Sequence, residues 1–230
     1  MRLIILGESV MQYPVPRVKI CCISSVEEAA LAVRYGAAAL GLVSQMPSGP
    51  GVISERLIAE IARTVPPGVA TFLLTSRQDV AGIIAQQRRC GVNTLQLCDH
   101  MEAGSHAALK KALPGVALVQ VIHVRDLTAL DEARAVAPHV DALLLDSGNP
   151  TLAVKQLGGT GRTHNWEISR QICRAVKRPV FLAGGLNPDN VHEAMDRVRP
   201  FALDLCSGVR EADRLDEAKL AAFFRRVRAA

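Results

Sequence analysis

The chain alternates between short runs of apolar residues and longer segments in which apolar residues recur every three or four positions. Short runs rich in Val, Ile and Leu are typical of parallel strands that are covered on both faces. We predict strands at 18–22, 38–44, 69–75, 93–98, 117–123, 141–146, 179–183 and 202–206. Helical spacing falls between them, as with Val26, Ala29, Ala30 and Val33, so strand and helix alternate throughout.

Residues typical of helix ends lie near the expected boundaries. Ser25 and Glu28 have the spacing of a capping box, and Asn187 followed by Pro188 predicts an N-cap and a first-turn proline. Glycine favours the end of a helix because it adopts the left-handed conformation without strain. Four glycines precede predicted strands: Gly36, Gly68, Gly91 and Gly115.

Eight strand–helix units in series predict an α/β fold whose parallel strands close into a (β/α)8 TIM barrel. Parallel neighbours require right-handed crossovers, and no long insertion interrupts the series. A doubly wound open sheet is the alternative that the pattern leaves open. The 230 residues suit a single domain, which we place at 18–230 after an N-terminal extension at 1–17.

Composition narrows the class of protein. Hydrophobic residues make up 49% of the chain and aromatic residues only 3%, which indicates an aliphatic core. The net charge of +5 favours anionic ligands, but the basic residues are scattered without interleaved aromatics, so we expect no nucleic-acid partner. The six cysteines form no CxxC pair, which favours reduced thiols and a cytoplasmic protein over a metal site. The apolar stretch near the N-terminus is too short for a secretory signal or a membrane span.

Three glycine-containing segments cluster late in the chain, at Gly158–Arg162, Ala183–Leu186 and Cys206–Arg210. The last two follow the seventh and eighth predicted strands, where barrels of this type commonly bind phosphate. Glycine turns expose backbone N–H groups, and a helix N-terminus adds positive potential. The spacing matches neither a nucleotide P-loop nor a dinucleotide fingerprint. We therefore predict a phosphate site without nucleotide hydrolysis.

Two ionisable residues, Cys21 and Asp146, end predicted strands at the same end of the barrel. The longest irregular segments, 44–53 and 147–164, follow the second and sixth strands and belong to that end too. A thiolate can remove a proton from carbon, and a carboxylic acid can protonate a ring oxygen. Taken alone, a cysteine such as Cys21 is more often a small buried hydrophobe, and an aspartate such as Asp146 is more often a turn or cap residue.

The motifs taken together are more specific than any one of them. In chain order they are KIC at 19–21, LQL at 95–97, LLLD at 143–146, GGTGRTHNW at 158–166, LAGGLNPDNV at 182–191 and DLCSGVR at 204–210. This combination resembles phosphoribosylanthranilate isomerase of tryptophan biosynthesis, from about Val18 to Phe224. The resemblance implies an isomerase that converts N-(5-phosphoribosyl)anthranilate to 1-(2-carboxyphenylamino)-1-deoxyribulose 5-phosphate by an Amadori rearrangement, with neither cofactor nor metal.

The resemblance also implies roles for individual residues. Asp146 would be the general acid that protonates the furanose ring oxygen, and Cys21 the general base that removes the C2 proton of the iminium species formed. Residues that would bind the phosphate are Gly184, Gly185, Ser207 and Gly208. Further substrate contacts would come from Gln96, Gly158, Gly159 and Asp204. The expected ligand is a small phosphorylated aminosugar, and the expected assembly is a monomer or a homodimer.

Four positions depart from the pattern of the family that the chain resembles. Cys22 replaces the glycine that follows KIC, and Gly51 stands where the family carries an arginine for the anthranilate carboxylate. Cys98 replaces a histidine, and Arg210 replaces a glutamate. Loss of a bidentate arginine leaves an alternative open, namely a divergent isomerase or a non-catalytic binder of another phosphorylated sugar. Arg162 and Arg210 are the candidate replacement cations.

Overall fold

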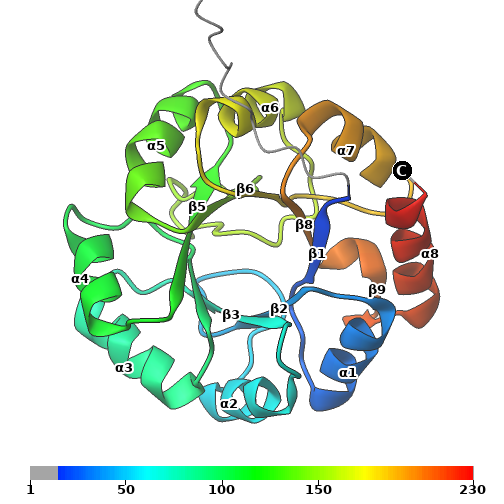
Figure 1. Ribbon diagram of the computed structural model, residues 1–230, viewed down its shortest axis with the longest axis horizontal. Helices are drawn as coiled ribbons and strands as arrows, with labels where there is room; N and C mark the ends of the chain where they lie inside the picture. Colours follow the sequence, from blue (N-terminus) through cyan, green and yellow to red (C-terminus); the bar gives the residue numbers. More distant parts are fainter. Residues whose placement is uncertain (1–14, 230) are drawn as a thin grey trace, which may run out of the picture.

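Eight parallel strands close into one barrel, and α-helices surround it in the computed structural model, which describes residues 15–229 (Figure 1). The strands are β1 (Arg17–Ile20), β2 (Ala39–Val43), β3 (Ala70–Thr75), β4 (Thr94–Leu97), β5 (Ala117–His123), β6 (Ala142–Asp146), β7 (Val180–Leu182) and β8 (Ala202–Leu205). The helices are α1 (Val26–Tyr35), α2 (Glu55–Thr64), α3 (Val80–Cys90), α4 (Ser105–Ala112), α5 (Thr128–Val136), α6 (Trp166–Ala175), α7 (Val191–Val198) and α8 (Glu217–Arg228). The predicted TIM barrel is confirmed, and β1 pairs with β8, which excludes an open sheet.

Successive side chains along each strand point alternately into the barrel and toward the helices, which gives two apolar layers. Even-numbered residues of β6, Ala142 and Leu144, pack inside the barrel, whereas Leu143 and Leu145 pack against the helices. Asp146 has the same parity as Leu144 and therefore points into the barrel at its C-terminal end. The same alternation places odd-numbered residues of β1 and even-numbered residues of β4 and β8 on the inside. The odd or even position of a residue in its strand therefore decides whether its side chain points into the barrel.

The predicted helix boundaries are right in part. Glu28 N donates to Ser25 Oγ at 3.2 Å, as a capping box requires, but the Glu28 carboxylate accepts from Ser24 N at 2.9 Å. The prediction for Asn187 is wrong, because α7 begins at Val191 after the N-cap Asn190. Asn187 Oδ1 instead accepts from the N–H groups of the turn before the helix, so Pro188 lies in that turn.

Two of the four predicted helix-ending glycines hold that position. Gly36 and Gly91 cap α1 and α3 in the left-handed conformation, with φ of 108° and 66°. Gly68 and Gly115 also have positive φ but lie beyond the caps of α2 and α4, which are Val65 and Leu113. The N-terminal extension predicted at 1–17 lies almost entirely outside the described residues, although β1 already begins at Arg17.

One local feature was not predicted from the sequence. After β8 the chain forms a single 3-10 turn at Ser207–Val209 and then a small antiparallel pair, β9 (Arg210–Glu211) and β10 (Arg214–Leu215), before α8 begins. Ala212 and Asp213 turn the chain between the two short strands, with φ of 45° and 60°. This hairpin holds the loop after β8 against α1 and α8.

Candidate active site

An open cavity lies at the C-terminal end of the barrel, where the ends of its strands and the following loops meet, and its empty space, including the open solvent at its mouth, is about 690 Å³. Both predicted catalytic residues line it. The full set of predicted site residues that line it is Cys21, Gln96, Asp146, Gly158, Gly159, Gly184, Gly185, Asp204 and Ser207. Gly208 lies just behind this wall, where a Cβ would come 2.0 Å from the Leu186 carbonyl oxygen. These residues are far apart in the sequence, and they meet here because they lie at the ends of strands and their side chains point to the inside of the barrel.

Asp146 is a buried carboxyl group at the end of β6. Its Oδ1 accepts a hydrogen bond from Ser147 N at 2.7 Å, and Oδ2 faces Gly158, where a Cβ would come within 2.6 Å of it. Burial raises the pKa of Asp146 and the nearby Asp204 carboxylate raises it further, against the opposing effect of the Ser147 N–H. A carboxyl group held in this way keeps its proton more readily than an exposed one, as a general acid requires.

Cys21 lies just beyond β1 and has the opposite character. Interaction with the adjacent Cys22 side chain lowers the pKa of Cys21, and the Lys19 ammonium lowers it as well, against burial and the Asp204 carboxylate, which raise it. Two other buried thiols line this cavity, Cys22 and Cys98, and the pKa of each is raised, at Cys98 mainly by burial. Cys21 is therefore the thiol in this cavity that is best suited to act as a base.

Lys19 is a site residue that the sequence analysis did not single out, although a lysine in an apolar strand was a signal. Its side chain is completely buried and donates to Asp204 Oδ1 at 2.8 Å. Gly41, on β2, makes room for it: a Cβ there would lie 3.0 Å from Lys19 Nζ and 2.8 Å from Cys21 Sγ. The ammonium and the thiol thus both border the space that a side chain at Gly41 would fill, and they lie within direct electrostatic range of each other.

The glycine turn after β7 has the left-handed backbone that exposes N–H groups in anion-binding turns. Gly184 and Gly185 have φ of 85° and 62°, and a Cβ on Gly185 would lie 2.7 Å from Thr163 N, so the segment before α6 packs directly on the turn. His164 belongs to that segment, and its Nε2 lies 2.7 Å from Ser169 Oγ. Burial lowers the pKa of His164 to about 4, so the imidazole is neutral at pH 7 and adds no charge beside this turn.

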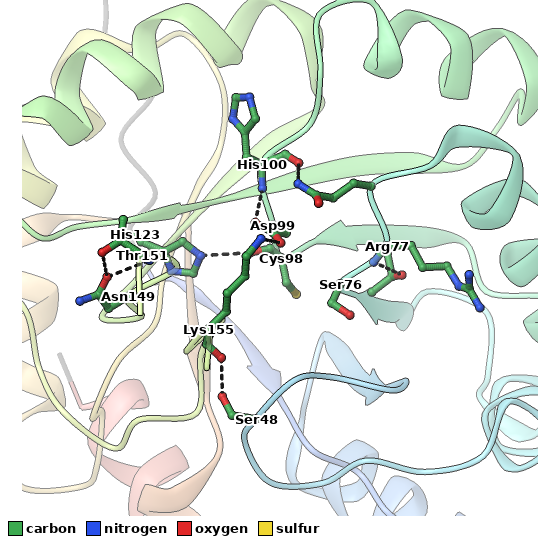
Figure 2. Close-up of polar contacts among 12 residues, drawn as sticks. Ser48, Ser76, Arg77, Cys98, Asp99, His100, His123, Asn149, Thr151 and Lys155 are labelled. Carbon is green, nitrogen blue, oxygen red and sulfur yellow. Dashed lines mark hydrogen bonds and ion pairs between the residues drawn. The ribbon is translucent and has the colours of Figure 1, made fainter. Parts of the chain in front are cut away.

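The two long loops predicted at this end are joined across the cavity (Figure 2). Ser48 Oγ, in the loop after β2, donates to the Lys155 carbonyl oxygen at 2.7 Å, and Lys155 Nζ pairs with Asp99 Oδ2 at 2.5 Å. Nearer to Asp146, Ser147 Oγ lies 2.5 Å from Thr160 Oγ1. The loop after β6 is thereby bonded to the loops after β2 and β4 and to Ser147 at its own start, and it covers the cavity.

Gln96 and His123 present polar atoms without a protein partner. Gln96 Oε1 and His123 Nδ1 are buried and make no hydrogen bond within the described part of the chain. His123 Nε2 lies 3.0 Å from the Cys98 carbonyl oxygen, which assigns the ring proton to Nε2 (Figure 2). Because Gln96 lines the cavity, its free acceptor is available to a hydroxyl group of a ligand.

The candidate replacement cations do not reach the cavity. Arg210 forms a salt bridge with Glu28 at 2.8 Å and also donates to the Cys22 carbonyl oxygen, with only 8% of its side chain exposed. Arg162 is exposed, and neither arginine lines the cavity. The space beside Gly51 is occupied by Cys22, because a Cβ on Gly51 would lie 2.5 Å from the Cβ of Cys22.

Other classes of site find no support within residues 15–229. No group of three or more His, Cys, Asp and Glu side chains in that range has a geometry that could hold a metal ion. None of the helices there is both long enough and apolar enough to cross a bilayer. All six cysteines are free thiols.

Comparison with known proteins adds an independent line of evidence. The family model described as N-(5'phosphoribosyl)anthranilate (PRA) isomerase matches residues 18–226. The chain is 35% identical to N-(5'-phosphoribosyl)anthranilate isomerase 2 of Methanosarcina mazei over 92% of this chain and 94% of that protein. It is 38% identical to the Geobacter metallireducens isomerase over 93% of this chain and 99% of that protein.

Solved structures are similar over nearly the whole chain. A phosphoribosyl anthranilate isomerase from Thermus thermophilus superposes with a TM-score of 0.79 at 27% identity, over 93% of this chain and 98% of that chain. A second isomerase, solved in complex with reduced 1-(o-carboxyphenylamino)-1-deoxyribulose 5-phosphate, gives a TM-score of 0.78 at 25% identity, over 94% of this chain and 100% of that chain.

Proposed function

This chain belongs to the phosphoribosylanthranilate isomerase family and is an isomerase that rearranges N-(5-phosphoribosyl)anthranilate in tryptophan biosynthesis, and we propose that Asp146 and Cys21 perform its two proton transfers. The relatives do not favour the alternative, which is a divergent isomerase or a non-catalytic binder of another phosphorylated sugar. The observation that carries the residue assignment is the pairing, in one cavity, of a carboxyl group whose pKa is raised with a thiol whose pKa is lowered.

In the first step, Asp146 donates its proton to the furanose ring oxygen. The bond between C1 and that oxygen breaks, and the nitrogen lone pair forms the iminium bond to C1, leaving the former ring oxygen as a hydroxyl group. Burial of Asp146 supports this step, because burial raises the pKa of a carboxyl group and so lets it keep its proton at a higher pH than an exposed one.

In the second step, the Cys21 thiolate removes the proton from C2. The electron pair of the C2–H bond neutralises the iminium group and gives an enol, which tautomerises to the 2-ketose with transfer of a proton to C1. The buried Lys19 ammonium beside Cys21 supports a thiolate in an otherwise apolar interior. Asp146 and Cys21 come from β6 and β1, so acid and base approach the substrate from different sides of the barrel mouth.

The remaining assignments concern the binding of the phosphorylated aminosugar. We place its phosphate against the backbone N–H groups of Gly184, Gly185, Ser207 and Gly208, supported by the left-handed turns after β7. Gln96 would accept a hydrogen bond from a sugar hydroxyl, and Gly158 and Gly159 would cover the sugar from the loop above Asp146. Asp204 would contribute to the site mainly by holding Lys19 in place, since one of its carboxylate oxygens already accepts a hydrogen bond from the Lys19 ammonium. The free thiols support the cytoplasmic location that we expect.

A fluorescence assay tests both the reaction and the residues. Purified protein mixed with freshly made N-(5-phosphoribosyl)anthranilate should change the anthranilate fluorescence over many turnovers. Cys21→Ala should lower kcat by about 10²–10⁴-fold, as loss of a general base does, while Cys173→Ala, on the outer helix α6, should leave it unchanged. A rate no faster than buffer would refute the activity, and a wild-type rate in Cys21→Ala would refute the role of Cys21.

A further inference from the structure

The turn that follows β1 carries the proposed base, Cys21. Cys21 N donates to the Leu205 carbonyl oxygen on β8 at 2.8 Å. Ile23 N donates to the Gly41 carbonyl oxygen on β2 at 3.0 Å. Between these two anchors Cys22 has a φ of 61° and is buried. A non-glycine residue costs conformational energy in this left-handed region and persists only where its surroundings hold it. The contacts that hold Cys22 therefore help to fix the position of Cys21.

Arg210 makes one of those contacts. Its Nη2 donates to the Cys22 carbonyl oxygen and also to Glu28 Oε2, the latter at 2.8 Å. Its Nη1 donates to Glu28 Oε1 at 3.0 Å and to the Asp213 carbonyl oxygen at 2.8 Å. Only 8% of the Arg210 side chain is exposed. Four hydrogen bonds on a buried planar fork hold the guanidinium group in one orientation, so the donor that faces Cys22 is fixed.

Glu28 contacts the same turn at a second point. Its Oε2 accepts a hydrogen bond from Ser24 N at 2.9 Å, and its Oε1 accepts one from Leu215 N at 2.8 Å. The Arg210–Glu28 pair is thus bonded to the turn at Cys22 and at Ser24, from the β9–β10 hairpin on one side and from α1 on the other. The peptide groups of this turn cannot rotate without breaking a hydrogen bond to a charged group.

Three of the four departures from the family pattern meet at this turn. Arg210 bonds to the Cys22 carbonyl oxygen, and a Cβ on Gly51 would lie 2.5 Å from the Cβ of Cys22. The glutamate that the family pattern carries in place of Arg210 could not donate to a carbonyl oxygen, and it would face Glu28 with a like charge. Arg210, Cys22 and Gly51 are therefore matched to one another around the residue that follows Cys21.

We propose that Arg210 is a positioning residue for the isomerisation: it holds the Cys22 carbonyl oxygen and so directs the Cys21 thiol toward C2 of the substrate. The proposal rests on Cys21 being the base. Position matters to this step because a shift of about 1 Å in a reacting group can lower the rate by about 10²-fold. Arg210 does not line the cavity, so it acts through the turn after β1 and not on the substrate.

Two variants separate positioning from stability. Arg210→Met removes every donor at this position and leaves the Glu28 carboxylate buried without its cation. The double variant Glu28→Gln/Arg210→Met removes that carboxylate too, so it should recover much of the lost stability in urea denaturation. Neither variant restores a donor to the Cys22 carbonyl oxygen. Lys219→Met is the matched control, because Lys219 bonds to the same hairpin at the Arg210 carbonyl oxygen and at Glu211.

The single and the double variant should both lower kcat by about 10–100-fold and change KM little, because the groups that bind the substrate stay in place. Arg210→Lys keeps a charged donor but not the planar fork, so its kcat should lie between those of Arg210→Met and the wild type. Lys219→Met should keep the wild-type kcat. A purely structural role predicts instead that kcat recovers together with stability in the double variant, and that result would overturn the proposal.

A cycle of substitutions with Cys21 separates this proposal from the assignment of the base. In a Cys21→Ala background no thiol remains to be positioned, so adding Glu28→Gln/Arg210→Met should lower the residual kcat little further. An equal fall in both backgrounds would refute the route through Cys21 and leave the base assignment intact. A wild-type kcat in Cys21→Ala would refute the base itself and, with it, the role of Arg210.

Discussion

Lys19 and Asp204 form a buried ion pair across β1 and β8, with Nζ and Oδ1 2.8 Å apart and the lysine side chain fully inaccessible to solvent. The two residues are direct neighbours in the register of the barrel. Burial disfavours the ammonium, but the Asp204 carboxylate and the neighbouring cysteines Cys21 and Cys22 together more than compensate and raise the pKa of Lys19. The pair brings a fixed positive charge to the interior beside Cys21, where a lone charge would be unstable.

Removing one member of this pair should destabilise the protein strongly. Lys19→Met leaves the Asp204 carboxylate buried without its partner, and we expect a loss of about 3–5 kcal/mol in the free energy of unfolding, measured by urea denaturation. The double variant Lys19→Met/Asp204→Leu should recover much of that loss, since it leaves no unpaired charge. Equal stability of the single and double variants would contradict the account of the pair.

Asp146→Asn should lower kcat by about 10²–10⁴-fold with a much smaller effect on KM, because asparagine preserves the shape of the side chain but cannot donate an acidic proton to the ring oxygen. Steady-state kinetics by anthranilate fluorescence measures both constants. Asp131→Asn, an exposed substitution on α5, is the matched control and should behave as wild type. Wild-type kcat in the Asp146 variant would remove the general acid from the mechanism.

Gly51→Ala should cost about 1–2 kcal/mol of stability, for two separable reasons. Alanine is strained at a φ of 78°, and its Cβ collides with Cys22. In a Cys22→Gly background only the first cost remains, so the same substitution should be better tolerated by at least about 0.5 kcal/mol, the coupling expected of residues in contact. Strict additivity in urea unfolding of the four proteins would mean that the two positions do not share space.

Glu28 should make the protein more stable above its unfolded-state pKa than below it. Burial opposes ionisation of Glu28, but hydrogen bonds from Arg210 and from the N–H groups of Leu215 and Ser24 lower its pKa overall. A depressed pKa in the folded state gives stability that is complete above about pH 4.5 and is lost as the pH falls through the folded-state value.

Glu28→Gln should therefore reduce stability at pH 7 and flatten its fall in acid, followed by urea denaturation from pH 7 down to about pH 3. Glu193→Gln is the control, since Glu193 pairs with Arg197 in an exposed i,i+4 bridge that contributes only about 0–1 kcal/mol. An identical pH dependence in the wild type and Glu28→Gln would show that the Glu28–Arg210 pair is not the source of the effect.

The sequence alone determined the barrel and the face that carries the site. Eight apolar runs of the right length define the strands, and a period of two fixes which side chains point inward, so the strand pattern by itself places Cys21 and Asp146 at the same end. Local signals for the ends of helices were less reliable. Asn187 is a residue type typical of an N-cap, yet Asn190 takes that position because the Asn187 side chain accepts hydrogen bonds within the preceding turn.

Only the tertiary structure decided what the departures from the family pattern mean. Arg210 looked like a replacement cation, but its partner Glu28 comes from α1, far away in the sequence. Nothing local links Cys22 to Gly51, because their contact arises where the loops after β1 and β2 converge. The periodicity of apolar residues shows which face of a helix or strand is buried. Which side chain fills a particular space depends on segments distant in the sequence that the barrel brings together.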